Sequence, residues 1–216
     1  MFRACRFIWV LSLALVTGCS TIKGWFSDDE FDPREPVELQ KITEQAKLKS
    51  RWSRGVGDGQ GEGLYKINPV LVKDTIYVAS AEGRVVAVEP ESGRVRWKRD
   101  LELALSGGVG HHGDSIFVGA SEGLVIRLDA SSGEEIWRTV VSGEVLSAPQ
   151  ANGQYTVAQT YDGKLMGFDY ETGEVRWTYT SDVPVLTLRG TGTPVIVGDN
   201  AIAGFADGKV VAVNLR

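Results

Sequence analysis

One stretch of fifteen residues recurs along this chain at a fixed spacing. Its three copies cover 83–97, 123–137 and 163–177, lie 40 residues apart and each end in tryptophan. A fourth copy begins at Gly208, and the sequence stops at Arg216, before the corresponding tryptophan. A fixed period of this length is typical of an array of supersecondary units, so it limits the possible folds more than any other feature does.

Each repeat contains two signals for a β-hairpin. An acidic residue followed by glycine separates two apolar runs and supplies the positive φ angles that tight hairpins need, as in Glu82-Gly83, Glu122-Gly123, Asp162-Gly163 and Asp207-Gly208. A longer turn then ends in Gly93, Gly133 or Gly173. In the first repeat these turns separate β-rich runs near 69–72, 75–79, 85–88 and 95–97. The pattern predicts an all-β fold, a β-propeller of four-stranded antiparallel blades.

The tryptophan of the repeat has a structural and a functional interpretation. Trp97, Trp137 and Trp177 are either wedges packed between neighbouring blades or platforms on which a ligand stacks. Strict repetition favours the wedge, because a ligand site needs one tryptophan rather than one per unit. We therefore expect the repeated tryptophans and the glycines at 93, 133 and 173 to be structural.

The repeat also resembles a known family. The pattern Ala/Gly-x-Asp-x-x-Ser/Thr-Gly-x-x-x-Trp, in variants, is similar to the tryptophan motif of quinoprotein-type propellers. Asp129 and Asp169 keep the acid of that motif, and Glu89 replaces it conservatively. Propellers of that family usually have eight blades, which the resemblance makes the expected number for the complete ring.

The propeller portion is predicted over 46–216, with full blades at about 64–102, 103–143 and 144–182 and a partial blade at 194–216. Residues 46–52 alternate with period two and end in Trp52, so we expect a strand there that completes a blade. A closed four-bladed ring would form if that strand joined the partial blade. We favour the alternative, in which the chain is the first part of an eight-bladed ring.

The N-terminus is predicted to be a lipoprotein signal peptide over 1–18. Arg3 and Arg6 precede an apolar run at 7–16, which is too short for a transmembrane helix. The run ends in Leu-Val-Thr-Gly-Cys, similar to the lipobox in which the cysteine, here Cys19, is acylated, for example with palmitate. Residues 19–45 would then be the lipidated N-terminus and tether. By the same resemblance, Ser20 indicates sorting to the outer membrane.

Cleavage after residue 18 would change the charge and the cysteine content. Removing Arg3 and Arg6 leaves 23 − 2 = 21 basic residues against 28 acidic ones, a net charge of −7. Such a chain is a poor candidate for nucleic-acid binding. Cys5 would also be lost, so Cys19 would be the only cysteine, without a disulfide or a cysteine metal cluster.

The sequence offers little support for an enzyme. The glycine-rich segment 55–63 has no P-loop lysine or following helix pattern, and His111 and His112 would point to opposite faces of a strand. The acids lie mainly in hairpin turns, so we predict no catalytic residues, no metal site and no cofactor. The main alternative is a periplasmic quinoprotein dehydrogenase, which by family resemblance would need pyrroloquinoline quinone and calcium. A propeller that binds peptide or cell-wall material is the other.

The combination of motifs resembles one family in particular. A lipobox, a short tether, the segment Trp-Ser-Arg-Gly-Val-Gly-Asp-Gly at 52–59 and the loop Leu-Thr-Leu-Arg-Gly at 186–190 are similar to the BamB family of outer-membrane protein assembly factors. That resemblance implies a non-enzymatic, lipid-anchored scaffold at the periplasmic face of the outer membrane. Its implied partners are the POTRA domains of BamA and the rest of the BAM complex.

The predicted partner site lies in the one connection that exceeds the repeat length. Pro149 and Pro194 are 45 residues apart where the repeat is 40, and the extension falls in 183–193. The resemblance implies that Leu186, Leu188 and Arg189 bind the partner. Ordinary packing between blades is the alternative for the two leucines.

Overall fold

The computed structural model describes residues 36–216 except 37, 44 and 64, in two compact units divided after Leu48. The predicted signal peptide, the acylation of Cys19 and much of the tether lie outside the described residues. The described residues before Lys49 are exposed and form neither helix nor strand. In the part of the chain that the structure describes, no helix has the length and apolarity needed to cross a membrane.

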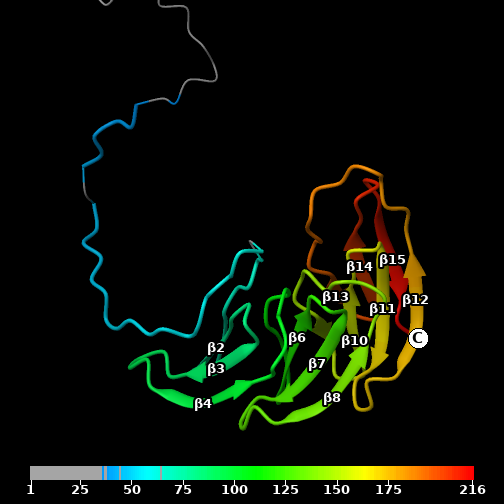
Figure 1. The fold of residues 1–216 in the computed structure, drawn as a ribbon, viewed down its shortest axis with the longest axis horizontal. Coiled ribbons are helices and arrows are strands. Elements are labelled where there is room, and N and C mark those ends of the chain that lie inside the picture. Colours follow the sequence, from blue (N-terminus) through cyan, green and yellow to red (C-terminus); the bar gives the residue numbers. More distant parts are fainter. Residues whose placement is uncertain (1–35, 37, 44, 64) are drawn as a thin grey trace, which may run out of the picture. The chain divides into compact units, whose positions relative to one another are not determined.

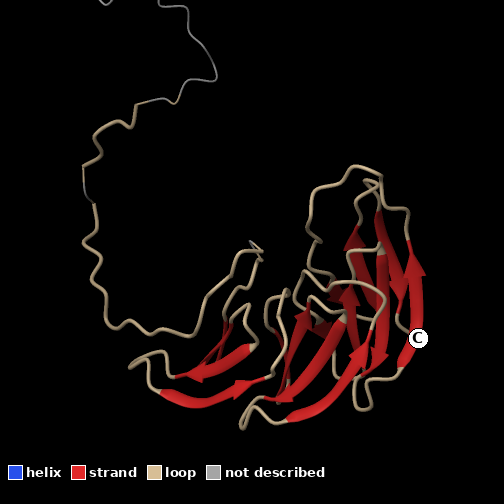
Figure 2. Ribbon diagram, in the orientation of Figure 1, coloured by secondary structure: helices blue, strands red, loops and turns tan. Residues whose placement is uncertain are grey.

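The second unit, 49–216, consists of fifteen strands in four antiparallel sheets (Figures 1 and 2). The first sheet contains β1 (Val70–Val72), β2 (Thr75–Ala79), β3 (Arg84–Val88) and β4 (Val95–Asp100). The second contains β5 (Gly110–His112), β6 (Ser115–Ala120), β7 (Leu124–Asp129) and β8 (Glu135–Val140). The third contains β9 (Gln150–Ala151), β10 (Tyr155–Gln159), β11 (Lys164–Asp169) and β12 (Val175–Thr180). The fourth contains β13 (Val195–Val197), β14 (Asn200–Gly204) and β15 (Val210–Asn214).

The fold prediction is confirmed: the sheets are meanders in chain order, repeated as propeller blades. Their first strands, β1, β5, β9 and β13, are neighbours in that order. The third and fourth strands of each complete sheet shift register at the same repeat position, after Ala87, Arg127 and Gly167. Each of the three complete sheets therefore has a β-bulge at the same place, a feature that bends the strand and increases its twist.

The hydrophobic core lies between successive sheets. One cluster joins the first and second sheets, a second joins the second and third, and a third joins the third and fourth. Each blade packs against a neighbouring blade on both of its faces. Side chains on both faces of an inner strand must therefore be apolar, and the strand sequence is a nearly continuous apolar run, such as Val85 to Val88.

The repeated tryptophans join each sheet to the next. The indole Nε1–H of Trp97 donates to the carbonyl oxygen of Ala130, and that of Trp137 to the carbonyl oxygen of Tyr170, both at 2.9 Å. Each ring also covers the glycine that ends the next sheet's turn: a Cβ on Gly133 would lie 2.5 Å from the Trp97 ring, and one on Gly173 would lie 2.6 Å from the Trp137 ring. This contact explains why tryptophan and glycine recur together.

The predicted strand at 46–52 is not formed. These residues have no hydrogen-bonded neighbour strand among the described residues, and Leu48 is exposed. A single strand has no neighbouring strand to hydrogen-bond with, so the period-two alternation of 46–52 did not suffice to predict a strand. Trp52 nevertheless behaves as its repeats do: its Nε1–H donates to the carbonyl oxygen of Pro90 at 2.8 Å, and its ring covers Gly93. Trp177 differs, because its buried Nε1 has no acceptor among the described residues.

The acids of the motif stabilise the turns between the last two strands. Oδ1 of Asp129 accepts the backbone N–H groups of Ser131 and Ser132, and Asp169 does the same for the equivalent residues of its own turn. The hydrogen bond from Arg176, together with those backbone donors, lowers the pKa of Asp169 to about 2. These carboxylates therefore have structural roles.

Candidate partner-binding surface

The loop 183–193, which connects β12 to β13, presents apolar side chains to solvent. Val185, Leu186 and Leu188 are 102%, 92% and 92% exposed. The repeat-equivalent residues of Val185 in the two preceding connections, Leu105 and Val145, are completely buried. The same position of the repeat is thus core in two connections and surface in the third, because the longer loop carries its apolar residues away from the sheets.

Arg189 fastens this loop to two other segments of the propeller. Its Nε and Nη2 donate to the two carboxylate oxygens of Glu144 at 3.2 and 2.5 Å. Its Nη1 donates to the carbonyl oxygen of Gly63 at 3.0 Å, and Nη2 also donates to the hydroxyl of Tyr65 at 3.0 Å. The guanidinium carbon lies 4.6 Å from the centre of the Tyr65 ring. A planar, five-donor group suits this arrangement, which lysine could not reproduce.

The electrostatics keep this anchor charged. The hydrogen bonds to Glu144 and then to Tyr65 raise the pKa of Arg189 above its ordinary value. The Glu144 carboxylate is mostly buried, whereas Arg189 is partly exposed. Partial burial and two-point geometry distinguish this pair from an ordinary surface salt bridge, which contributes little.

The three predicted partner residues therefore have different surroundings. The structure places Leu186 and Leu188 free on the surface and Arg189 in contacts within the chain. Sequence reasoning missed Glu144 and Tyr65 as the groups that hold the loop. The sequence contained one weak indication that Glu144 has a specific role. The repeat-equivalent residue in the preceding connection is Ala104, and no turn requires an acid at this position.

A small hollow lies beneath the loop, between the third and fourth sheets. Its volume is about 200 Å³, and its lining includes Thr187, Gly190, Gln159 and Phe205. The side-chain Nε2 of Gln159 donates to the carbonyl oxygen of Gly204 at 2.9 Å, while its Oε1 has no partner among the described residues. The loop thus spans the junction and leaves a space beneath its polar backbone.

The described residues contain no group of three or more His, Cys, Asp or Glu side chains placed to hold a metal ion. His111 and His112 lie on β5, as adjacent residues of a strand. Burial lowers the pKa of His111 below its ordinary value. His112 packs edge-on against Tyr170, with ring centres 5.8 Å apart.

Comparison with known proteins gives a consistent result. The family model described as "Outer membrane protein assembly factor BamB" matches residues 81–216, and one described as "Glucose/ethanol/alcohol dehydrogenase, beta-propeller domain" matches 37–112. An outer membrane protein assembly factor BamB from Pseudomonas aeruginosa is 59% identical over 96% of this chain and 53% of its own length. One from Kangiella koreensis is 47% identical with the same coverage.

A solved structure agrees with these relatives. The crystal structure of BamB from Moraxella catarrhalis superposes with a TM-score of 0.65 at 26% identity, covering 69% of this chain and 45% of that one. The chain spans about half the length of the curated relatives it matches, 53% in both cases.

Proposed function

The chain belongs to the BamB family of outer membrane protein assembly factors, and from that premise we propose that it is a non-catalytic scaffold of the BAM complex. In this proposal the protein is anchored by acylated Cys19 to the periplasmic face of the outer membrane. It binds the POTRA domains of BamA through the loop 183–193 and assists the insertion of β-barrel proteins.

The exposed leucines of the loop carry the proposal for the binding site. Leu186 and Leu188 are 92% exposed, although a soluble surface normally leaves few large apolar groups so accessible on one short loop. Val185 adds a third apolar side chain beside them. Protein interfaces typically have such apolar anchors at their buried centre and polar groups around them.

Arg189 supports the site in a second way. Because its guanidinium group is engaged by Glu144, Gly63 and Tyr65, it fixes the base of the loop before any partner arrives. A loop that is already ordered loses less conformational entropy on binding. We propose that Arg189 is chiefly a positioning residue for the two leucines.

Leu186→Ala and Leu188→Ala are each expected to weaken binding to purified BamA POTRA domains. Losing a central anchor costs about 2 kcal/mol or more, roughly thirtyfold in affinity. Because both side chains are on the surface, the melting temperature should stay close to that of the parent. Affinity is measured by calorimetry, beside thermal melting monitored by circular dichroism.

Two further variants separate positioning from direct contact. Arg189→Ala should weaken binding, and Glu144→Gln should weaken it in the same direction although Glu144 is mostly buried. Unchanged binding in all the leucine and arginine variants would disprove the site. A large fall in melting temperature accompanying the loss would show that the leucines pack within the fold instead.

Cys19→Ala is expected to release the protein from the outer-membrane fraction, because an acyl-modified cysteine is the proposed anchor. The net charge of −7 expected after cleavage at residue 18 opposes adhesion to anionic lipid. The measurement is fractionation of cells expressing the parent or the variant, followed by immunoblotting. Thr21→Ala, which keeps both Cys19 and Ser20, is the matched control. A variant that remains as firmly in the membrane as the parent would remove lipidation as the anchor.

A further inference from the structure

A cavity of about 490 Å³ opens at the junction of the first and second sheets. Its lining includes Thr75, Tyr77, Trp97, Ala130 and Ser131. The β1–β2 turn borders it at Lys73 and Asp74, and the β5–β6 turn does so at Gly113 and Asp114. In an antiparallel meander these turns lie at the end of the sheets opposite the connections between sheets. The cavity is therefore remote from the loop 183–193, and its volume is within the range of small-ligand sites.

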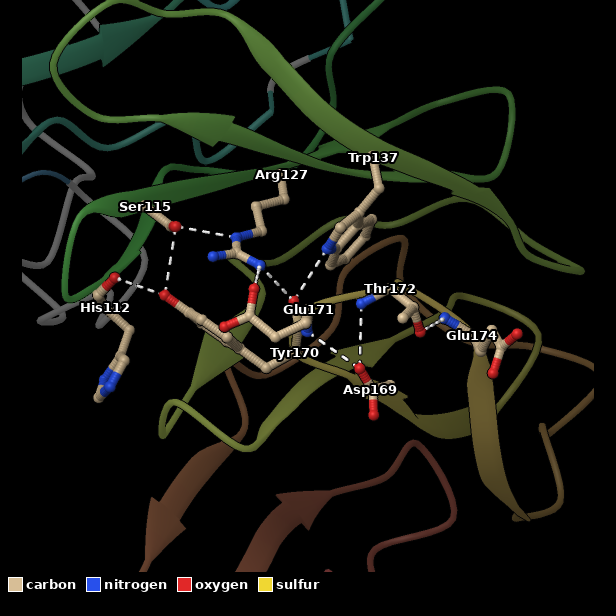
Figure 3. A network of polar contacts seen from close by, with 9 residues as sticks. All are labelled: His112, Ser115, Arg127, Trp137, Asp169, Tyr170, Glu171, Thr172 and Glu174. Carbon is tan, nitrogen blue, oxygen red and sulfur yellow. Dashed lines mark hydrogen bonds and ion pairs between the residues drawn. The ribbon is translucent and has the colours of Figure 1, made fainter.

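The repeat supplies an internal comparison for this cavity. At the next junction, between the second and third sheets, the side chain of Arg127 lies at the equivalent place, beside Ser115 and Tyr170 (Figure 3). Its Nε donates to Ser115 Oγ at 2.8 Å, and its Nη1 donates to the carbonyl oxygen of Tyr170 at 2.6 Å and pairs with Glu171 at 2.9 Å. The guanidinium carbon lies 3.9 Å from the centre of the Tyr170 ring.

Small residues leave this part of the first junction open. At a spacing of 40 residues, Ala87 takes the place of Arg127, which faces Trp137 across the strand pair as Ala87 faces Trp97. The other partners change in the same way: Thr75 replaces Ser115, Ala130 replaces Tyr170, and Ser131 replaces Glu171. Arginine and tyrosine thus become two alanines, while the hydroxyl at the position of Ser115 and the tryptophan of the site are kept.

The chemistry of the walls suits a cation with a flat apolar face. Tyr77 and Trp97 form an aromatic pair with ring centres 6.0 Å apart. The hydroxyl of Tyr77 donates to the carbonyl oxygen of Ala130 at 3.0 Å, and so satisfies the group that Arg127 satisfies in the next repeat.

The charges of the lining favour a cation slightly. The lining has three carboxylates, Asp74, Asp114 and Asp129, against two basic groups, Lys73 and Arg96, which leaves 3 − 2 = 1 negative charge with His111 neutral. Arg96 is already paired with Asp74 at 2.8 Å. Aromatic faces beside carboxylates are the usual surroundings of a bound guanidinium group.

We propose that this cavity binds the arginine side chain of another polypeptide, in the place that Arg127 occupies within the chain at the next junction. The guanidinium group lies against Tyr77 and Trp97, near Thr75, and the carboxylates of Asp114 and Asp129 at the rim hold its charge. The site is independent of the loop 183–193, so it offers a second contact at the opposite end of the sheets.

Titration with short peptides tests the proposal in the full chain. Acetyl-Gly-Arg-Gly-amide is expected to shift the Trp97 indole N–H signal in nitrogen–proton NMR spectra in a saturable way. The peptides with lysine or with citrulline in place of arginine should bind at least about fivefold more weakly, since the first lacks the planar fork and the second lacks the charge. No saturable shift, or equal binding of the lysine peptide, would overturn the proposal.

A second experiment fills the cavity with a side chain of the protein itself. Ala87→Arg installs the side chain that the next repeat carries and should reduce binding of the arginine peptide at least about tenfold. Ala212→Arg is the matched control, because it adds the same charge at the repeat-equivalent position on exposed β15 and should leave binding unchanged. Undiminished binding in Ala87→Arg would overturn the site. Should that variant fail to fold, the comparison of the three peptides on the unaltered chain decides alone.

Discussion

Replacing Trp137 with alanine is expected to lower the free energy of unfolding by about 3–5 kcal/mol, the usual cost of removing a buried aromatic side chain. Trp137 is 8% exposed and lies between complete sheets, packed against Phe117 and Phe168. The variant also leaves the carbonyl oxygen of Tyr170 without its indole donor. Urea denaturation followed by circular dichroism measures the change.

An exposed apolar residue serves as the control for that variant. Leu48→Ala, at a side chain that is 96% exposed, should change the free energy of unfolding by less than about 0.5 kcal/mol. Equal denaturation midpoints for Trp137→Ala and Leu48→Ala would show that the tryptophan does not join the sheets energetically.

Gly133→Ala is expected to cost about 2–5 kcal/mol in the free energy of unfolding, for two reasons. The backbone φ of Gly133 is +74°, a conformation that costs other residues about 1–2 kcal/mol. The new methyl group would also lie 2.5 Å from the Trp97 ring, and overpacking of this kind costs about 1–3 kcal/mol. The same denaturation experiment measures the sum.

Gly198→Ala separates these two contributions. Gly198 has a φ of +58°, but a Cβ there would meet nothing within 4 Å, so only the backbone cost of about 1–2 kcal/mol should appear. If Gly133→Ala were no more destabilising than Gly198→Ala, the contact between tryptophan and glycine would contribute nothing beyond the turn.

The fold of the repeat could be predicted from the sequence because the same residues are required by the turn and by the packing between sheets. Gly93, Gly133 and Gly173 are needed for a left-handed turn and again for the tryptophan above them. Asp129 and Asp169 stabilise their own turns through backbone donors two and three residues on. Such short-range rules act within one hairpin, so the pattern predicted the blades correctly.

The sequence pattern gave a wrong prediction where the structure of a segment depends on a partner strand elsewhere. The alternation at 46–52 predicted a strand, but alternation only says which faces a strand would have, and a strand forms only beside another. Trp52 still docks on Gly93, because that contact needs one side chain and one turn rather than a ladder.

In the candidate site, too, some features could be predicted from the sequence and others could not. The excess length of 183–193 and its two leucines were visible in the sequence, and they predicted an interface loop. That Arg189 is bound by Glu144 and Tyr65, 45 and 124 residues away, was not visible, because the pairing depends on how three connections meet above the sheets.

The sequence by itself thus determined the repeat, the turns, the wedge residues and the unusual loop, since each rests on contacts within one unit or between adjacent units of fixed spacing. Only the tertiary structure decided which side chain fills each junction. The exchange of Arg127 for Ala87 looks like ordinary variation in a strand until the blades are stacked. When the blades stack, the buried Arg127 side chain fills one junction and pairs with Glu171 at its surface, whereas Ala87 leaves a cavity at the other. The reason is that the volume between two blades is set by residues from both.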